Sequence, residues 1–269
     1  MFDWFGWWQY DFMRNALWAV LLIMPLFTLL GSMVVSNGMA FFSDALGHSA
    51  LTGAGIGVIL GASSLEWPMV LFAVVFALLM NLVRRSRLSS TDTIISVFSS
   101  CGVALGLIIL SRGGGFARYQ NLLIGDILSI APRELAVLAL ALLATALVWL
   151  ALFNKMYAVS ISPAMAKSKG IPVALLDNLF VVLVAVVVML AIRWVGLLMI
   201  NAMLILPAAA SRNLAKNLSS YHGITLLFGL FSGITGLITS YYLAVPTGPM
   251  IVLVASILFF GSFLMRNKG

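Results

Sequence analysis

The sequence predicts an all-α, polytopic membrane protein with eight or nine transmembrane helices, and its composition and hydropathy pattern lead to this fold class. Of its 269 residues, 62% are hydrophobic and only 9% are charged, whereas soluble domains carry about 25% charged residues. The apolar residues gather in runs near the length of about 20 residues that a helix needs to cross the hydrocarbon core. The net charge of +7 fits the excess of Lys and Arg in cytoplasmic loops and requires no nucleic-acid partner.

Nine runs of spanning length follow one another with no separate soluble domain, so residues 1–269 are interpreted as one transmembrane domain. The sixth and seventh runs meet at Arg193-Trp194-Val195-Gly196, where we expect a tight hairpin or a kink. Some breaks are short, and eight spans is the alternative count. The runs cover residues 16–36, 44–61, 67–83, 92–111, 134–153, 173–193, 196–214, 222–243 and 249–265.

Basic residues set the expected orientation. If the chain crosses nine times, four basic loops fall on one side and hold ten of the 15 Lys and Arg residues. The positive-inside rule assigns that side to the cytoplasm, which places the C-terminus inside and the N-terminus outside. These residues are Arg84, Arg85, Arg87, Lys155, Lys167, Lys169, Arg212, Lys216, Arg266 and Lys268.

The stretch at about residues 120–131 is too short to cross the membrane. We expect it to form a short re-entrant or extracytoplasmic helix before the 134–153 run. Proline at the first helical position and an acidic residue in the first turn mark helix starts. Pro132 and Glu134 therefore predict where the next helix begins.

Asp44 and His48 stand four residues apart at the head of the second run. Residues at positions i and i+4 share one face of a helix, with Cβ atoms about 6 Å apart, so both side chains can reach one point. Ionisable residues inside a membrane are costly and usually functional, and a carboxylate with an imidazole suits Zn²⁺ or Mn²⁺. The alternative is that Asp44 caps the helix while His48 bonds to the backbone.

Two ligands do not complete a tetrahedral metal site. Two copies of the chain that face each other across a two-fold axis would supply four, with Asp44 and His48 from each. Downstream of the pair, Gly53, Gly57 and Gly61 are spaced four apart, and small residues at this spacing let helix backbones approach closely. We therefore expect the helix with the ligand pair to be crowded by neighbouring helices rather than to face lipid.

A short cytoplasmic helix is predicted at about residues 162–172, between two runs. Ser162 can cap it, Pro163 can start it and Gly170 can end it, because these residue types favour those positions. Such a helix is a docking element for a peripheral protein, and an ordinary basic loop is the alternative.

Three further residues are candidates for a pathway or a gate. Asp126 follows Gly125 on the outer side, and Asn201 lies two turns before Pro207, which is expected to kink its helix. The sequence contains no G-x-x-x-x-G-K-[ST] motif, so this chain is not expected to bind ATP through a P-loop.

Five motifs resemble those of the membrane permeases of bacterial zinc and manganese ABC importers, the ABC-3 type, and the zinc branch most closely. The first runs from Asp44 to Gly53 and contains both candidate ligands; the others cover residues 122–132, 161–170, 195–209 and 246–249. Two departures stand out. Ser36-Asn37-Gly38 occupies a place where arginine is frequent, and Lys167 and Lys169 occupy places where acids are common.

The resemblance implies a type II ABC importer-like permease in the bacterial cytoplasmic (inner) membrane, with no permanently bound cofactor. Two copies would form a homodimer around a central pathway, and two cytoplasmic P-loop ATPase subunits would bind and hydrolyse ATP. An extracytoplasmic metal-binding protein would deliver Zn²⁺ or Mn²⁺. The resemblance assigns Asp44 and His48 as ion ligands, and Pro163, Ala166 and Gly170 as positions that couple to the ATPase.

Under this interpretation the chain is a transport subunit and not an enzyme, and zinc is the expected metal. Import of manganese or iron by the same family is the nearest alternative. Alternatives from other classes are a cation transporter or channel that needs no ATP, an intramembrane enzyme that uses Asp44 and His48 as an acid–base pair, and a purely structural membrane subunit.

Overall fold

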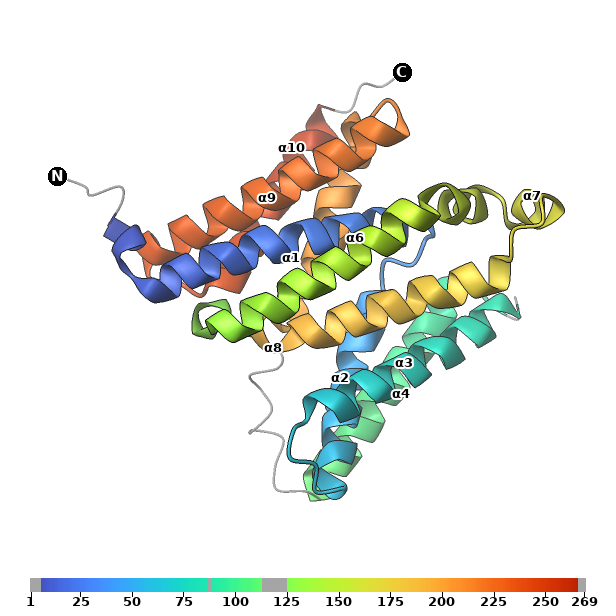
Figure 1. The fold of residues 1–269 in the computed structure, drawn as a ribbon, viewed down its shortest axis with the longest axis horizontal. Helices are drawn as coiled ribbons and strands as arrows, with labels where there is room; N and C mark the ends of the chain where they lie inside the picture. Colours follow the sequence, from blue (N-terminus) through green and yellow to red (C-terminus); the bar gives the residue numbers. More distant parts are fainter. Residues whose placement is uncertain (1–5, 87–88, 113–124, 266–269) are drawn as a thin grey trace. The chain divides into compact units, whose positions relative to one another are not determined.

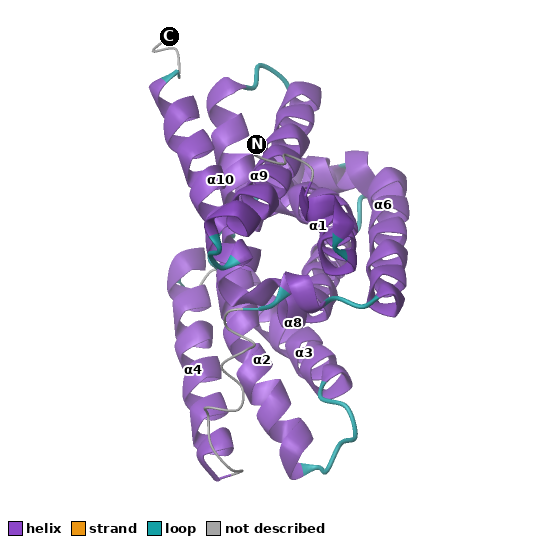
Figure 2. Ribbon diagram, turned by 90° about the vertical axis from the view of Figure 1, so that its left-hand side faces the viewer, coloured by secondary structure: helices purple, strands orange, loops and turns teal. Residues whose placement is uncertain are grey.

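The computed structural model describes residues 6–86, 89–112 and 125–265, and this part of the chain forms helices and loops without a strand (Figures 1 and 2). The all-α fold class predicted from the sequence is confirmed. Three short helices are η1 (Gly6–Gln9), η3 (Ile127–Ser129) and α7 (Pro163–Ser168). The long helices are α1 (Asp11–Ser36), α2 (Phe42–Ile59), α3 (Glu66–Arg85), α4 (Thr91–Arg112), α6 (Pro132–Ile161), α8 (Val173–Leu214), α9 (Leu218–Leu243) and α10 (Thr247–Leu264).

Helix α8 is too long for a single crossing. It contains 42 residues and would be about 63 Å long if it were straight, twice the hydrocarbon thickness of about 30 Å. Gly196 interrupts it with φ 76° and ψ 158°. The predicted junction is therefore a kink rather than a tight hairpin. With α8 counted as two segments, the eight long helices of the described residues give nine long helical segments, which approximately fits the predicted count of eight or nine.

One long helix differs from the rest in hydropathy. Among the described residues, seven helices are long and apolar enough to cross a membrane, and α2 is not among them. Asp44 and His48 both lie on α2 and lower its hydropathy. A helix of this kind is stable in a bilayer only where neighbouring protein or water meets its polar groups.

The chain divides into two compact units. The first comprises residues 1–35, 121–144 and 193–269, and the second comprises residues 36–120 and 145–192. The division falls inside α6 and α8. One transmembrane domain over residues 1–269 stays a prediction, and each unit is described by itself below.

In the second unit, α2, α3 and α4 lie side by side in both views (Figures 1 and 2). Glycines allow this close approach. A Cβ atom added at Gly53 of α2 would lie 2.7 Å from Met69 Cα of α3, and one at Gly106 of α4 would lie 3.0 Å from Thr52 N of α2. The Thr52 hydroxyl also donates to the Gly102 carbonyl at 2.7 Å. The prediction that α2 is crowded by neighbouring helices is confirmed.

In the first unit, α1, α9 and α10 are joined in a similar way. A Cβ atom at Gly236 of α9 would lie 2.6 Å from Ile251 Cα of α10, and one at Gly229 would lie 2.4 Å from Thr28 Cγ2 of α1. The Tyr221 hydroxyl donates to the Ser32 carbonyl at 3.2 Å. Small residues and backbone-directed hydrogen bonds therefore hold both units, as is common where lipid removes the hydrophobic driving force between helices.

Candidate functional site

Asp44 and His48 share one face of α2, as their spacing predicts. His48 Nε2 lies 3.5 Å from Asp44 Oδ2, and their side chains are 27% and 38% exposed respectively. Phe41 occupies the N-cap position and the helix begins at Phe42, so Asp44 lies inside the first turn. Neither side chain is enclosed by this chain alone.

The separation of the two side chains suits a shared ion. Two atoms that each bind one ion at about 2.1 Å lie about 3.0–3.5 Å apart, depending on whether the geometry is octahedral or tetrahedral. In the described residues no group of three or more His, Cys, Asp or Glu side chains gathers to hold a metal. Asp44 and His48 are therefore a partial ligand set, with room for further ligands on their exposed side.

A pocket of about 230 Å³ opens beside Asp44, within the second unit. The start of α2 contributes one wall and the first half of α4 contributes the other. The sequence analysis did not single out the serines of α4, although their i, i+3, i+4 spacing in an apolar run places them on one face. The lining residues are Phe41, Asp44, Ile95, Ser96, Ser99 and Ser100.

The contacts between α2 and α4 also fix the relative direction of these two helices. Near the start of both helices, Asp44 of α2 shares the pocket with Ser96 and Ser99 of α4. Further along both helices, Thr52 of α2 bonds to Gly102 of α4. The two helices are therefore parallel. Ser96 and Ser99 lie five and eight residues after Thr91, where α4 begins, which corresponds to about 8–12 Å along the axis. Asp44, in the first turn of α2, therefore lies level with the second and third turns of α4.

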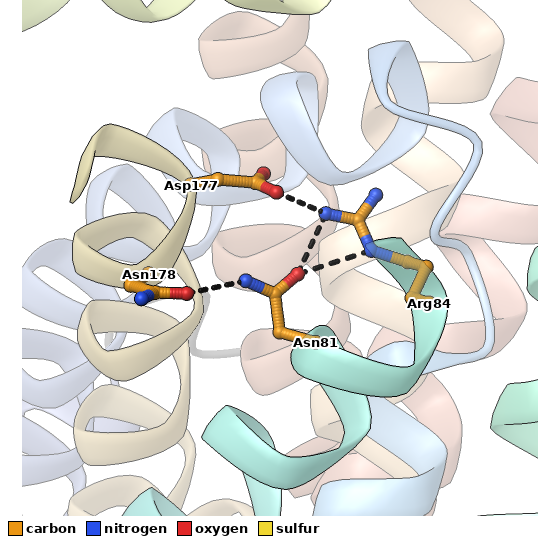
Figure 3. Close-up of polar contacts among 4 residues, drawn as sticks. All are labelled: Asn81, Arg84, Asp177 and Asn178. Carbon is orange, nitrogen blue, oxygen red and sulfur yellow. Dashed lines mark hydrogen bonds and ion pairs between the residues drawn. The ribbon is translucent and has the colours of Figure 1, made fainter. Parts of the chain in front are cut away.

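A separate polar network joins the end of α3 to the start of α8 (Figure 3). Asn81 Nδ2 donates to Asn178 Oδ1 at 2.8 Å. Arg84 donates to Asn81 Oδ1, at 2.7 Å from Nη2 and 3.1 Å from Nε, and Nη2 also donates to Asp177 Oδ2 at 2.7 Å. The Arg84 and Asp177 side chains are only 15% and 16% exposed. The sequence analysis assigned Arg84 to a basic loop and did not predict this network.

The predicted short cytoplasmic helix forms as α7. Ser162 Oγ accepts a hydrogen bond from the Met165 N–H at 3.3 Å, and Pro163 is the first helical residue. Gly170 has φ +73° and donates to the Lys167 carbonyl at 3.0 Å, which ends the helix. The local prediction is confirmed, and the segment is not an ordinary loop.

The exposed surface of α7 differs from the expected coupling positions in one respect. The Ala166 side chain is 1% exposed and is covered by this chain itself, whereas Met165 is 59% exposed. Pro163 and Gly170 are also exposed. The Ala166 side chain is therefore not accessible to another protein, while its neighbours on α7 are. The coupling role of all three expected positions stays a prediction.

Asp126 lies in the first unit, where it caps η3. Its Oδ1 accepts from the Leu128 N–H at 3.2 Å, and it lines a pocket of about 120 Å³ with residues near Gly196 and residues around the start of α10. Gly125 has φ +70°, and a Cβ atom there would lie 2.3 Å from Gly196 N, so glycine is required for this contact. Of the short helix expected at residues 120–131, only η3 lies in the described part, because residues 120–124 are outside it.

Asn201 and Pro207 lie on α8 after its kink. Asn201 is half-buried and Pro207 is buried. The non-helical residue inside α8 is Gly196 and not a neighbour of Pro207, so the principal break lies about three turns earlier than the proline suggests. A gating role for Asn201 or Pro207 stays a prediction.

Comparison with known proteins identifies the family. The model of the ABC 3 transport family matches residues 9–266. The chain belongs to this family. The resemblance inferred from the five motifs is therefore confirmed, and the ABC-3 assignment covers almost the whole permease rather than one motif.

Curated relatives of this ABC-3 permease are named for two metals. It is 31% identical to the manganese transport system membrane protein MntC of Listeria monocytogenes, over 97% of this chain and 92% of that protein. It is 28% identical to the high-affinity zinc uptake system membrane protein ZnuB of Haemophilus influenzae, over 89% of this chain and 92% of that protein. These identities do not separate a zinc from a manganese branch.

A solved structure shows the same fold. PsaBC from Streptococcus pneumoniae, in complex with Fab, matches with a TM-score of 0.84 and 28% sequence identity, over 98% of this chain and 95% of that chain. A second, inward-facing structure of a metal-chelate type ABC transporter matches with a TM-score of 0.74 at 18% identity, a level that shows the fold alone.

Proposed function

We propose that this chain is the membrane permease of an ATP-driven importer for a divalent transition metal, Zn²⁺ or Mn²⁺. The family assignment supports an ABC transport subunit, and the names of MntC and ZnuB support these two metals. The proposed location is the bacterial cytoplasmic membrane, with the C-terminus in the cytoplasm. Iron is a weaker alternative, because only the chemical types of the two ligands support it and neither cited relative is named for iron.

The observation that carries the proposal is the Asp44–His48 pair. A carboxylate and an imidazole lie 3.5 Å apart on α2, the long helix of the described residues that is not a candidate span, and the carboxylate lines a pocket between α2 and α4. Placing an ionisable pair there costs free energy unless an ion or water compensates. A passing divalent cation provides that compensation, so both residues serve as transient ligands.

A homodimer would bring further ligands to this site. One chain supplies two ligands of the kinds that bind these metals, and both remain partly exposed. Two copies related by a two-fold axis would bring Asp44 and His48 from each to a common ion and so provide four ligands. The pathway would then run between the copies, and alternating exposure of the site to either side would move the ion.

ATP hydrolysis is assigned to two partner subunits that dock on α7. The capped α7 helix offers Met165 and its basic neighbours to another protein, and the sequence has no P-loop motif of its own. An extracytoplasmic binding protein would bring the metal to the outer side. No resident cofactor is needed in the permease itself.

Uptake by vesicles that contain the complete transporter tests this function. The permease, its ATPase and its binding protein are reconstituted, and Zn²⁺ and Mn²⁺ uptake is measured in competition, with and without ATP. We expect uptake of at least one metal only when ATP is present. Uptake that persists without the ATPase or ATP would instead support an ATP-independent cation transporter or channel.

A further inference from the structure

The serines beside Asp44 extend the proposed site. We propose that Ser96, Ser99 and Ser100 of α4 form an oxygen-lined wall of the ion site and favour Mn²⁺ over Zn²⁺. The inference rests on the proposed function, and it adds three specificity-determining residues to the Asp44–His48 pair.

The geometry places these hydroxyls with the carboxylate. Ser96, Ser99 and Ser100 share one face of α4 and line the same 230 Å³ pocket as Asp44. A cavity needs only about 10–15 Å³ of this kind of volume to hold one water molecule, so the pocket has room for an ion that keeps part of its hydration shell. The apolar wall is limited to Phe41 and Ile95.

These serines differ from others in the same chain. A serine inside a helix commonly donates its hydroxyl to a carbonyl three or four residues earlier, as Ser49, Ser111 and Ser256 do at 2.6–2.9 Å. In the described residues, Ser96, Ser99 and Ser100 form no such side-chain hydrogen bond. Their hydroxyls are therefore free to bind water or an ion, which a serine engaged with its own backbone does less well.

Oxygen-rich surroundings discriminate between the two metals. Carboxylate, hydroxyl and water ligands suit Mn²⁺, which accepts six oxygen-rich ligands, whereas Zn²⁺ prefers four ligands drawn largely from nitrogen and sulfur. One imidazole with a carboxylate and a wall of three hydroxyls presents more oxygen than nitrogen. The wall also holds water around the ion, so a cation that retains several waters fits this pocket better than a tetrahedral one.

Competition uptake by the reconstituted transporter tests the role of the serines, with the same binding protein in every sample. We expect the triple variant S96A/S99A/S100A to lower the ratio of Mn²⁺ to Zn²⁺ uptake by about tenfold, the scale seen when groups supporting a metal site are removed. Each single variant is expected to lower the ratio by less. Ser99→Thr keeps a hydroxyl and is expected to keep the wild-type ratio.

Ser111→Ala is the matched control because Ser111 lies on the same helix but donates to the Ile108 carbonyl at 2.8 Å. It is expected to leave the ratio unchanged. If the triple variant does not assemble, the single variants carry the test, since each removes only one oxygen atom.

Three results would overturn the proposal. A triple alanine variant, or a full set of single alanine variants, with the wild-type ratio contradicts a role in selectivity while ATP-dependent transport still stands, and so does a triple variant that loses uptake of both metals equally. A wild-type transporter that prefers Zn²⁺ contradicts it as well. Absence of ATP-dependent uptake of either metal in the wild type contradicts the proposed function itself.

Discussion

Two polar groups of the second unit show how differently a membrane bundle can hold charge. In the network of Asn81, Arg84, Asp177 and Asn178, the side chains bond to one another at 2.7–3.1 Å (Figure 3). On α2, Asp44 lies 3.5 Å from His48 and lines a pocket with serine hydroxyls that have no bond to their own helix. The side chains of the first group bond to one another, whereas the second group lines a pocket that is open to solvent.

The difference separates structure from transport. A buried charge that is fully paired stabilises the fold only as long as both partners remain, and removal of one leaves the other uncompensated. A pair that opens into a polar pocket instead keeps binding capacity for something outside the chain. We therefore expect variants of the network to lower stability and variants of the Asp44 site to lower transport.

The largest expected effect is on transport, from Asp44→Asn. The substitution keeps the size of the side chain but removes the negative charge that attracts a divalent cation. Uptake of Zn²⁺ and Mn²⁺ by the reconstituted transporter is expected to fall to the level of vesicles without the permease. The melting temperature is expected to stay close to that of the wild type, because Asp44 is 38% exposed.

Asp92→Asn is the matched control, since Asp92 is an exposed acid at the start of α4. It is expected to retain uptake. Normal uptake by Asp44→Asn, and likewise by His48→Gln, would refute the assignment of the pair as ion ligands.

The substitution Arg84→Met in the network is expected to have the opposite effect, lowering stability while transport remains. This variant leaves the Asp177 carboxylate 16% exposed without its guanidinium partner, and we expect a loss of about 2–3 kcal/mol in the free energy of unfolding, below the 3–5 kcal/mol of a fully buried pair. Thermal denaturation of the purified transporter measures the loss. Uptake per assembled complex is expected to remain.

The double variant Arg84→Met with Asp177→Leu removes both charges, and we expect it to recover much of the lost stability because no charge is left unpaired. A single variant as stable as the wild type would show that the network does not join α3 to α8 energetically.

A smaller loss is expected where α2 is held in place, from Gly53→Ala. The added Cβ atom would lie 2.7 Å from Met69 Cα, which is backbone and cannot rotate away. Overpacking of this kind costs about 1–3 kcal/mol. Gly223→Ala on α9, where nothing lies within 4 Å of the new atom, is instead expected to gain about 0.5–1 kcal/mol. Equal melting temperatures for the two variants would contradict the crowding of α2.

The local features of the sequence predicted much of this molecule. Apolar runs located the spanning helices, and the residues around Ser162 and Gly170 located α7, because caps act within a few residues of the chain. The i, i+4 spacing of Asp44 and His48 placed them on one face for the same reason. Features that depend only on residues a few positions apart in the same helix can therefore be predicted from the sequence.

The features that sequence reasoning missed all join distant segments. Arg84 was assigned to a loop, but its partner Asp177 lies 93 residues away. The serines of α4 became notable only when the parallel packing of α2 and α4 placed them beside Asp44. A hairpin or kink was expected at residues 193–196 and a further kink at Pro207, and the non-helical residue inside α8 is Gly196. In each case tertiary packing supplied information that local patterns do not contain.

The smallest effect is expected for a hydroxyl that already donates a hydrogen bond within the chain, that of Thr52. Thr52→Val keeps the shape of the side chain but removes the hydrogen bond to the Gly102 carbonyl, 2.7 Å away on α4. Interhelical hydrogen bonds of this kind contribute about 0.6 kcal/mol on average, so a decrease of about that size in the free energy of unfolding is expected. The ratio of Mn²⁺ to Zn²⁺ uptake is expected to stay the same, in contrast to the serine variants. If Thr52→Val changed the ratio as strongly as the triple serine variant, selectivity would depend on how closely α2 and α4 pack, and not on which hydroxyls are free to meet the ion.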